Sequence, residues 1–112
     1  MKVKAKINVH TNDIDDLENE DITIGEIYNV IGIEGDYYRL VNDAKEPILY
    51  PKTLFDIIDP DTPADWLKTE DEGDIFVEPR ETSIPGFYED YFDGDQDSIK
   101  IYKEMLEKNK IF

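Results

Sequence analysis

IGEIYNVIGIEGDYYRLV, residues 24–41, is the stretch that decides the fold of this chain. It contains two runs of β-branched and aromatic residues, Ile27–Ile33 and Tyr37–Val41, separated by Glu34-Gly35-Asp36. Ile, Val and Tyr favour strands, and a short glycine-containing segment between two such runs is typical of a turn. The stretch therefore predicts two strands joined by a tight turn.

Three further strands are predicted around this stretch. From Val3 to Val9 apolar residues alternate with Lys and Asn, which is the period of a half-buried strand. Pro47–Tyr50 and Phe55–Ile58 are short apolar runs, and Pro51–Phe55 between them predicts one helical turn. Five short strands with tight turns within residues 1–59 predict a small closed β-barrel.

The same residues resemble the Src-homology-3 family. Ile24–Val30 is similar to the glycine-acid-apolar stretch of those domains, and Tyr37–Leu40 stands where they place paired aromatic residues. Pro51–Phe55 is similar to the turn that precedes their last strand. The resemblance implies a five-stranded Src-homology-3-like barrel. Tyr37 replaces the tryptophan that grips proline-rich peptides in that family.

Residues 60–112 predict an acidic extension that ends in an amphipathic helix. Ala64–Leu67 and Gly86–Phe92 predict single helical turns, and Gly73–Val77 predicts an added strand. The helix is predicted over Gln96–Lys108, with carboxylates before its start and lysines near its end, where they suit the helix dipole. Its apolar residues recur at helical spacing: Ile99, Tyr102, Met105 and Leu106. The whole chain is expected to be a mainly β (α+β) protein, with the extension packed on the barrel as one globular unit.

The formal net charge of −16 limits the classes of partner. Residues 56–97 hold fifteen acids against Lys68 and Arg80, a net charge of −13. Such a chain repels phosphate backbones and anionic membranes, so no direct binding to nucleic acid or membrane is expected. It carries no cysteine, no signal-peptide pattern and no long apolar run. We expect a cytoplasmic protein that is a monomer when free and binds a basic protein.

Nothing in the sequence suggests catalysis. His10 is the only histidine, the only serines are Ser83 and Ser98, and glycines occur singly rather than in a phosphate-binding loop. A pair of working carboxyl groups would need a cleft that sets one pKa apart from the other. We expect no enzyme activity and no cofactor, with His10 as a surface residue at a strand end.

One segment partly matches a calcium loop. Asp93, Asp95, Asp97 and Glu104 stand at the first, third, fifth and twelfth positions of that pattern. The sixth position, which needs glycine, is Ser98, and the predicted helix has begun before Glu104. Capping of the helix start explains the same acids, so no metal is expected.

The candidate partner-binding residues combine aromatic rings with carboxylates, as protein recognition surfaces do. They are Tyr88, Glu89, Asp90, Tyr91, Phe92 and Asp93, with Asp65 and Trp66 as a second group. The alternative is that these rings cover the barrel.

The favoured function is an acidic inhibitor of a basic, nucleic-acid-processing protein, similar in type to the immunity partners of bacterial nuclease toxins. A phage anti-defence protein would be of the same physical kind. The alternative of another class is a peptide-binding adaptor whose groove is walled by exposed aromatics. Its candidates are Tyr28, Tyr37, Tyr38, Tyr50 and Phe55.

Overall fold

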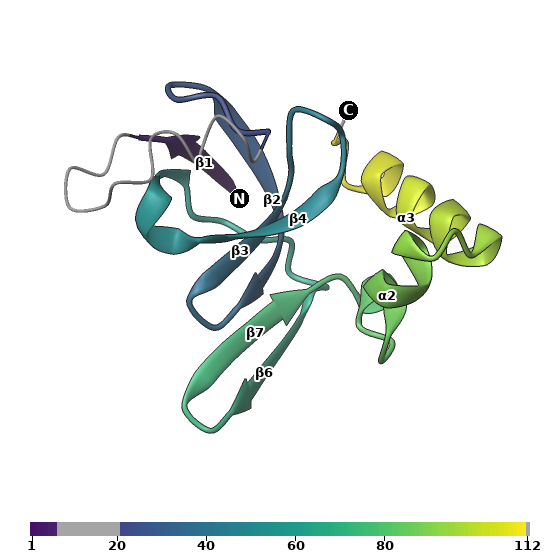
Figure 1. Cartoon of the computed structure of the whole chain (residues 1–112). Helices are drawn as coiled ribbons and strands as arrows, with labels where there is room; N and C mark the ends of the chain where they lie inside the picture. The colour runs from purple at the N-terminus through teal and green to yellow at the C-terminus, as the bar shows by residue number, and fades with distance from the viewer. Residues whose placement is uncertain (7–20, 112) are drawn as a thin grey trace.

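The two strands predicted within residues 24–41 are present in the computed structural model, which describes residues 1–6 and 21–111 (Figure 1). They are β2 (Ile27–Glu34) and β3 (Tyr37–Val41). The other strands are β1 (Lys2–Ala5), β4 (Pro47–Pro51), β5 (Phe55–Asp59), β6 (Leu67–Asp71) and β7 (Asp74–Glu78). Two 3-10 turns, η1 (Lys52–Leu54) and η2 (Arg80–Thr82), and two helices, α2 (Phe87–Phe92) and α3 (Gln96–Lys108), complete the described part. The protein is mainly β, as predicted.

The strands form one antiparallel sheet of seven in the order β4-β3-β2-β1-β5, with β7 also paired to β2 and β6 to β7. Strand β2 is long enough for one of its edges to serve two partners. Its first half pairs with β1, and Ile33 and Glu34 near its end pair with Val77 and Phe76 of β7. Within the described residues β4 and β5 are the two ends of the path and do not pair. The predicted closed barrel is therefore wrong, and the five-stranded Src-homology-3-like arrangement is not confirmed.

Two apolar cores lie on opposite sides of β2. Val30 belongs to the first core, which also includes Val3, Tyr38, Leu40 and Tyr50. Its neighbour Ile31, which is fully buried, belongs to the second core, which the helices supply. The register of β2 against β3 shifts by one residue between Val30 and Gly32, and at this β-bulge β2 connects the two cores directly.

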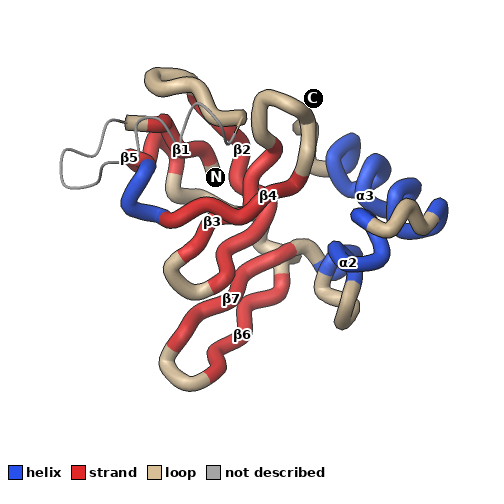
Figure 2. Tube along the Cα trace, viewed as in Figure 1, coloured by secondary structure: helices blue, strands red, loops and turns tan. Residues whose placement is uncertain are grey.

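Helices α2 and α3 lie together on one side of the sheet (Figure 2). Helix α3 has the predicted bounds, and its inward residues Tyr102 and Met105 are buried beside Ile31 and Phe87. Burial of this apolar stripe holds the helical layer against the sheet. No helix among residues 1–6 and 21–111 has the length and apolarity needed to cross a membrane.

Other predictions differ in detail. Ala64–Leu67 is not a helix: Trp66 N–H donates to Pro63 O in a turn, and Leu67 already begins the unpredicted strand β6. The strand predicted at Gly73–Val77 is present as β7. Strand β1 confirms the start of the predicted Val3–Val9 strand, whereas its second half, His10 and the acidic stretch up to residue 20 lie outside the described residues.

Candidate functional site: a carboxylate-lined pocket beside helix α2

A pocket of ≈270 Å³ lies between the sheet and the segment that leads into α2. Strands β2, β3 and β7 contribute Glu34, Arg39 and Glu78, and residues 82–89 form the opposite wall. Gly32 lies between the strand positions of Arg39 and Glu78, and a Cβ atom there would stand 3.6 Å from Arg39 Cβ and 3.9 Å from Glu78 Cβ. Because Gly32 has no side chain, the space between Arg39 and Glu78 is left unfilled at this position.

Arg39 is fully engaged in this pocket. Its Nε and Nη2 each lie 3.0 Å from Glu34 Oε2, and its Nη1 donates to Pro47 O at 2.8 Å. The Arg39 Cζ atom stands 3.9 Å from the centroid of the Tyr88 ring, within range of a cation–π contact. Charge-assisted hydrogen bonds to a carboxylate are among the stronger ones, so Glu34 and Arg39 form a tight pair.

Glu78 has no such partner. None of the ion pairs between described residues involves its carboxyl group. Desolvation by partial burial, with repulsion from Glu34, raises the pKa of Glu78 to about 7, although the charge of Arg39 acts in the opposite direction. The pocket therefore holds a carboxyl group that changes charge near neutral pH, which is common at functional sites.

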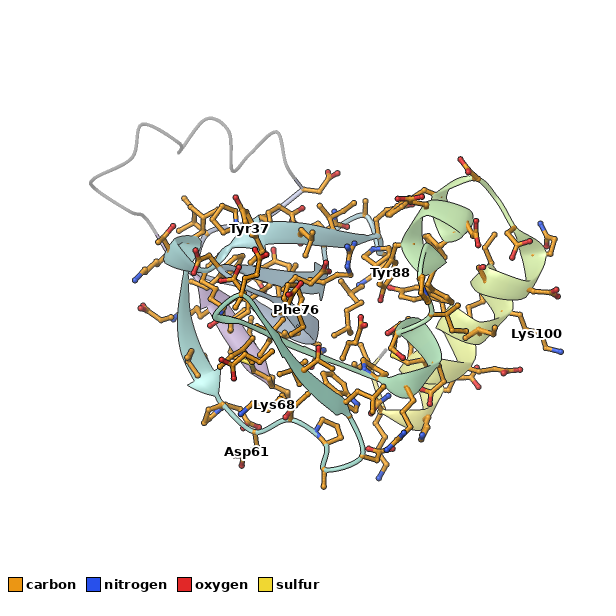
Figure 3. The ribbon with its side chains drawn as sticks, turned by 90° about the horizontal axis from the view of Figure 1, so that it is seen from below. Tyr37, Asp61, Lys68, Phe76, Tyr88 and Lys100 are labelled. Atoms are coloured by element: carbon orange, nitrogen blue, oxygen red, sulfur yellow. The ribbon has the colours of Figure 1, made fainter. Side chains whose placement is uncertain are left out.

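Tyr88, a predicted partner-binding residue, is a wall of this pocket rather than a protruding anchor (Figure 3). Its ring packs edge-on against Phe87 at a centroid distance of 5.1 Å. Burial raises the pKa of its phenol well above the usual value, so the hydroxyl stays protonated. Glu89, the next residue, is exposed and lines the same pocket. The structure thus places Tyr88 and Glu89 together with three unpredicted residues, Glu34, Arg39 and Glu78.

The remaining candidates on α2 form an elbow between α2 and α3. Asp90 and Asp93 are exposed. Tyr91 is half-buried, with its ring 4.8 Å from that of Tyr102, whereas Phe92 is 48% exposed. Of the predicted aromatic anchors, Phe92 alone has an exposed ring, and the alternative that the rings cover the core holds for Tyr91.

The second candidate group lies elsewhere, at the end of α3. Asp65 pairs with Lys108 at 3.1 Å, and that lysine lowers the pKa of the Asp65 carboxyl. Trp66 is only 9% exposed, and its Nε1 donates to Asn109 Oδ1 at 3.2 Å. These contacts tie the segment before β6 to the C-terminal end of the chain, so Asp65 and Trp66 do not join the α2 group.

The aromatic residues considered for an adaptor groove are mostly core residues. Tyr28, Tyr38, Tyr50 and Phe55 are 2–6% exposed, and Tyr37 alone is open, at 48%. The aromatic wall that a proline-rich peptide needs is therefore not formed by these residues.

The calcium-like segment starts α3. Asp95 is the N-cap, and its Oδ2 accepts hydrogen bonds from Ser98 N at 3.0 Å and Ser98 Oγ at 2.8 Å. These bonds lower the pKa of Asp95. Capping is thus the structural role of this carboxylate. Among residues 1–6 and 21–111, no group of three or more acids or histidines is arranged to hold a metal ion.

No family model matches the chain, and no curated protein or solved structure matches it either. The pocket combines three carboxyl groups with the guanidinium of Arg39. The Glu34 carboxylate is paired with Arg39, the Glu78 carboxyl group has no ion pair with a described residue, and Glu89 is exposed, while the Tyr88 ring carries the Arg39 guanidinium on its face.

Proposed function

We propose that the protein binds a basic partner protein and inhibits it, in the manner of an immunity protein, by presenting carboxylates to residues that hold phosphates. The observation that carries this proposal is Glu78, a half-buried carboxyl group without a cationic partner among the described residues, in a pocket that also contains Glu34 and Glu89. A phage anti-defence protein would use the same surface in the same way.

A basic side chain is the ligand that best complements this pocket. A half-buried charge is costly without a partner, and an entering guanidinium or ammonium group would supply one to Glu78. The volume of ≈270 Å³ suits one such group on its apolar stem, which would pack along Tyr88. Entry of the cation would lower the pKa of Glu78 and so favour its charged form.

The surroundings of the pocket favour the same partner. Between residues 81 and 99 there is no Lys or Arg. Twelve of the fifteen acids in residues 56–97 are exposed. At the elbow, Glu89, Asp90 and Asp93 are exposed and stand within three residues of the exposed Phe92. Such a field attracts basic proteins over long range and raises their association rate.

The pocket is tested with the blocked peptide acetyl-Gly-Arg-Gly-amide, followed by NMR at pH 8. We expect weak saturable binding, with shifts at Gly32, Arg39 and Tyr88. The matched peptide acetyl-Gly-Gln-Gly-amide should not bind. Glu78→Gln should abolish binding, whereas Asp71→Asn, which removes an exposed charge at the tip of the β6–β7 hairpin, should leave it intact. Equal binding of the Arg and Gln peptides, or unchanged binding by Glu78→Gln, would refute the pocket.

The whole surface is tested on the complex with a basic partner isolated from the native host. Joint replacement of Glu89→Lys and Asp90→Lys should weaken that complex by about a hundredfold, because charges beside an aromatic contact dominate recognition. Tyr37→Ala, on a different part of the sheet, should leave it unchanged. The reverse pattern would transfer the function to the adaptor class.

The resemblance to Src-homology-3 domains remains a proposal for the arrangement of β1–β5 alone. Their order, with the 3-10 turn η1 between β4 and β5, supports it. The proposed function does not depend on it.

A further inference from the structure

A second cavity, of ≈480 Å³, lies on the opposite face of β7 from the carboxylate pocket. Glu78 faces the pocket, and its neighbour Val77 lines this groove, as the alternation of a strand requires. Pairing across five strands aligns Tyr50, Tyr38, Ile33, Val77 and Lys68 in one row. Tyr50 and Tyr38 are covered by the first core. Ile33 packs against that core at its edge, and Ile33, Val77 and Lys68 line the groove.

The walls of the groove are apolar and its charged groups are basic. Ile33, Val77 and Trp66 lie within it, and Ile75 at its edge is 43% exposed. Of the described residues that line it, Lys52 and Lys68 are the charged ones. Neither lysine takes part in an ion pair with another described residue, although Lys52 Nζ stands 5.4 Å from the Tyr38 ring centroid.

A neighbouring pocket of ≈430 Å³ is also lined by lysines as its charged described residues. It shares Pro63 and Trp66 with the groove and adds Lys2 and Lys110. A quarter of the chain is Asp or Glu, yet none of the seventeen described residues that line the two cavities is acidic. Asp61, between two lining residues, lies at the edge of the molecule and outside the lining (Figure 3). Among the described residues, the lining of these two cavities therefore carries lysines and no carboxylate.

We propose that this groove binds an acidic segment of a partner protein, with an apolar side chain between Ile33, Ile75 and Trp66 and flanking carboxylates on Lys52 and Lys68. Charge complementarity identifies the occupant: two ammonium groups at an apolar cleft pair with carboxylates beside an apolar side chain. A second copy of this chain would bring its own charge of −16, which opposes self-association. The site is independent of the carboxylate pocket, which selects the opposite charge.

The test uses a synthetic peptide array in which each apolar residue is flanked by Asp or Glu, and a matched array flanked by Lys or Arg. We expect labelled protein to bind members of the acidic array only. Trp66 is the only tryptophan and lines both cavities, so the best acidic peptide should change its fluorescence in a saturable titration. Joint Lys52→Glu and Lys68→Glu replacement should weaken binding about tenfold or more. Lys103→Glu, on the exposed side of α3, is the matched control.

Circular dichroism of the double variant checks that its fold is kept, since Lys68 is exposed but Lys52 is partly buried. The single variant Lys68→Gln gives a milder change that should still weaken binding. The proposal is overturned if no acidic peptide binds, if the basic array binds equally, or if the variants bind as wild type does. Dodecanoate binding without peptide binding would identify a small carboxylate as the ligand and overturn it. Sedimentation showing a wild-type dimer that Lys68→Glu dissociates would assign the groove to a second copy and overturn it too.

Discussion

At the scale of single residues, Glu78 is the least satisfied charged group of the candidate site. Glu34 takes the guanidinium of Arg39, so two carboxyl groups share one nearby cation. A folded-state pKa above the unfolded value means that the folded protein holds the proton more tightly. Folding is then more favourable where Glu78 is protonated, and this advantage is lost as the pH rises toward and through about 7.

Glu78→Gln should therefore stabilise the protein at pH 8 and have little effect at pH 5. A shift from 4.5 to about 7 would be worth about 3 kcal/mol at full value, and solvent screening of a half-buried group reduces this to about 1–2 kcal/mol. Urea unfolding at both pH values measures the difference between variant and wild type. Equal stability of the two proteins at pH 8 would show that Glu78 is not destabilised by its surroundings.

At the scale of elements, α3 depends on its N-cap. Asp95→Ala removes the acceptor of the Ser98 N–H and should lower the melting temperature by roughly 2–8 °C. Asp97→Ala, in the same first turn but without that bond, should have a smaller effect, through the helix dipole alone. Thermal unfolding followed by circular dichroism measures both. An equal loss in the two variants would contradict the capping role of Asp95.

The same cap predicts the response to calcium. Because the Asp95 carboxylate already accepts two hydrogen bonds from Ser98, millimolar calcium should leave the melting temperature of wild type almost unchanged. A ligand that binds only the folded state raises stability by RT ln(1 + [L]/Kd), so even modest binding would be visible. A calcium-dependent rise that Asp95→Ala abolishes would assign the segment to a metal.

Elements with a local signal were predictable, and those without one were not. Helix α3 was predicted with its bounds because spacing, cap and terminal charges agree. Strand β6 was missed because LKTED has one apolar residue and acids disfavour strands. It becomes a strand by pairing with β7, which pairs in turn with β2. The pairing of β7 with β2 also brings Glu78 beside Glu34 and Arg39. No residue spacing in the sequence predicts this pairing.

At the scale of the whole molecule, acidic and basic side chains are distributed differently among the described residues. The acids of segment 56–97 are exposed around the elbow and at the tip of the β6–β7 hairpin, whereas the charged described residues that line the two cavities at Trp66 are lysines. Composition predicted an acidic surface, but it could not predict this basic lining, because four lysines far apart in sequence supply it. Trp66 was predicted as a second-choice partner-binding residue; in the structure it is buried, and its Nε1 donates to Asn109 Oδ1.

The net charge predicts how stability depends on salt. Repulsion among 28 acids opposes folding, and salt screens it over a Debye length of about 10 Å at 0.1 M. Added sodium chloride should therefore raise the melting temperature. Joint Glu70→Lys and Glu72→Lys replacement at the exposed hairpin tip reduces the net charge and should reduce this gain. A melting temperature insensitive to salt in wild type would mean that repulsion does not limit stability.

The two cores on either side of β2 restrict which mutations this strand can have accepted during evolution. Val30 and Ile31 are adjacent, yet each serves a different core. An ancestor could exchange either residue for another apolar one and disturb a single core. Gain or loss of one codon within Ile27–Glu34 would instead change the spacing around the β-bulge between Val30 and Gly32, where neighbouring side chains serve both cores. In the evolution of this protein, apolar substitutions within β2 should therefore be tolerated more readily than insertions or deletions.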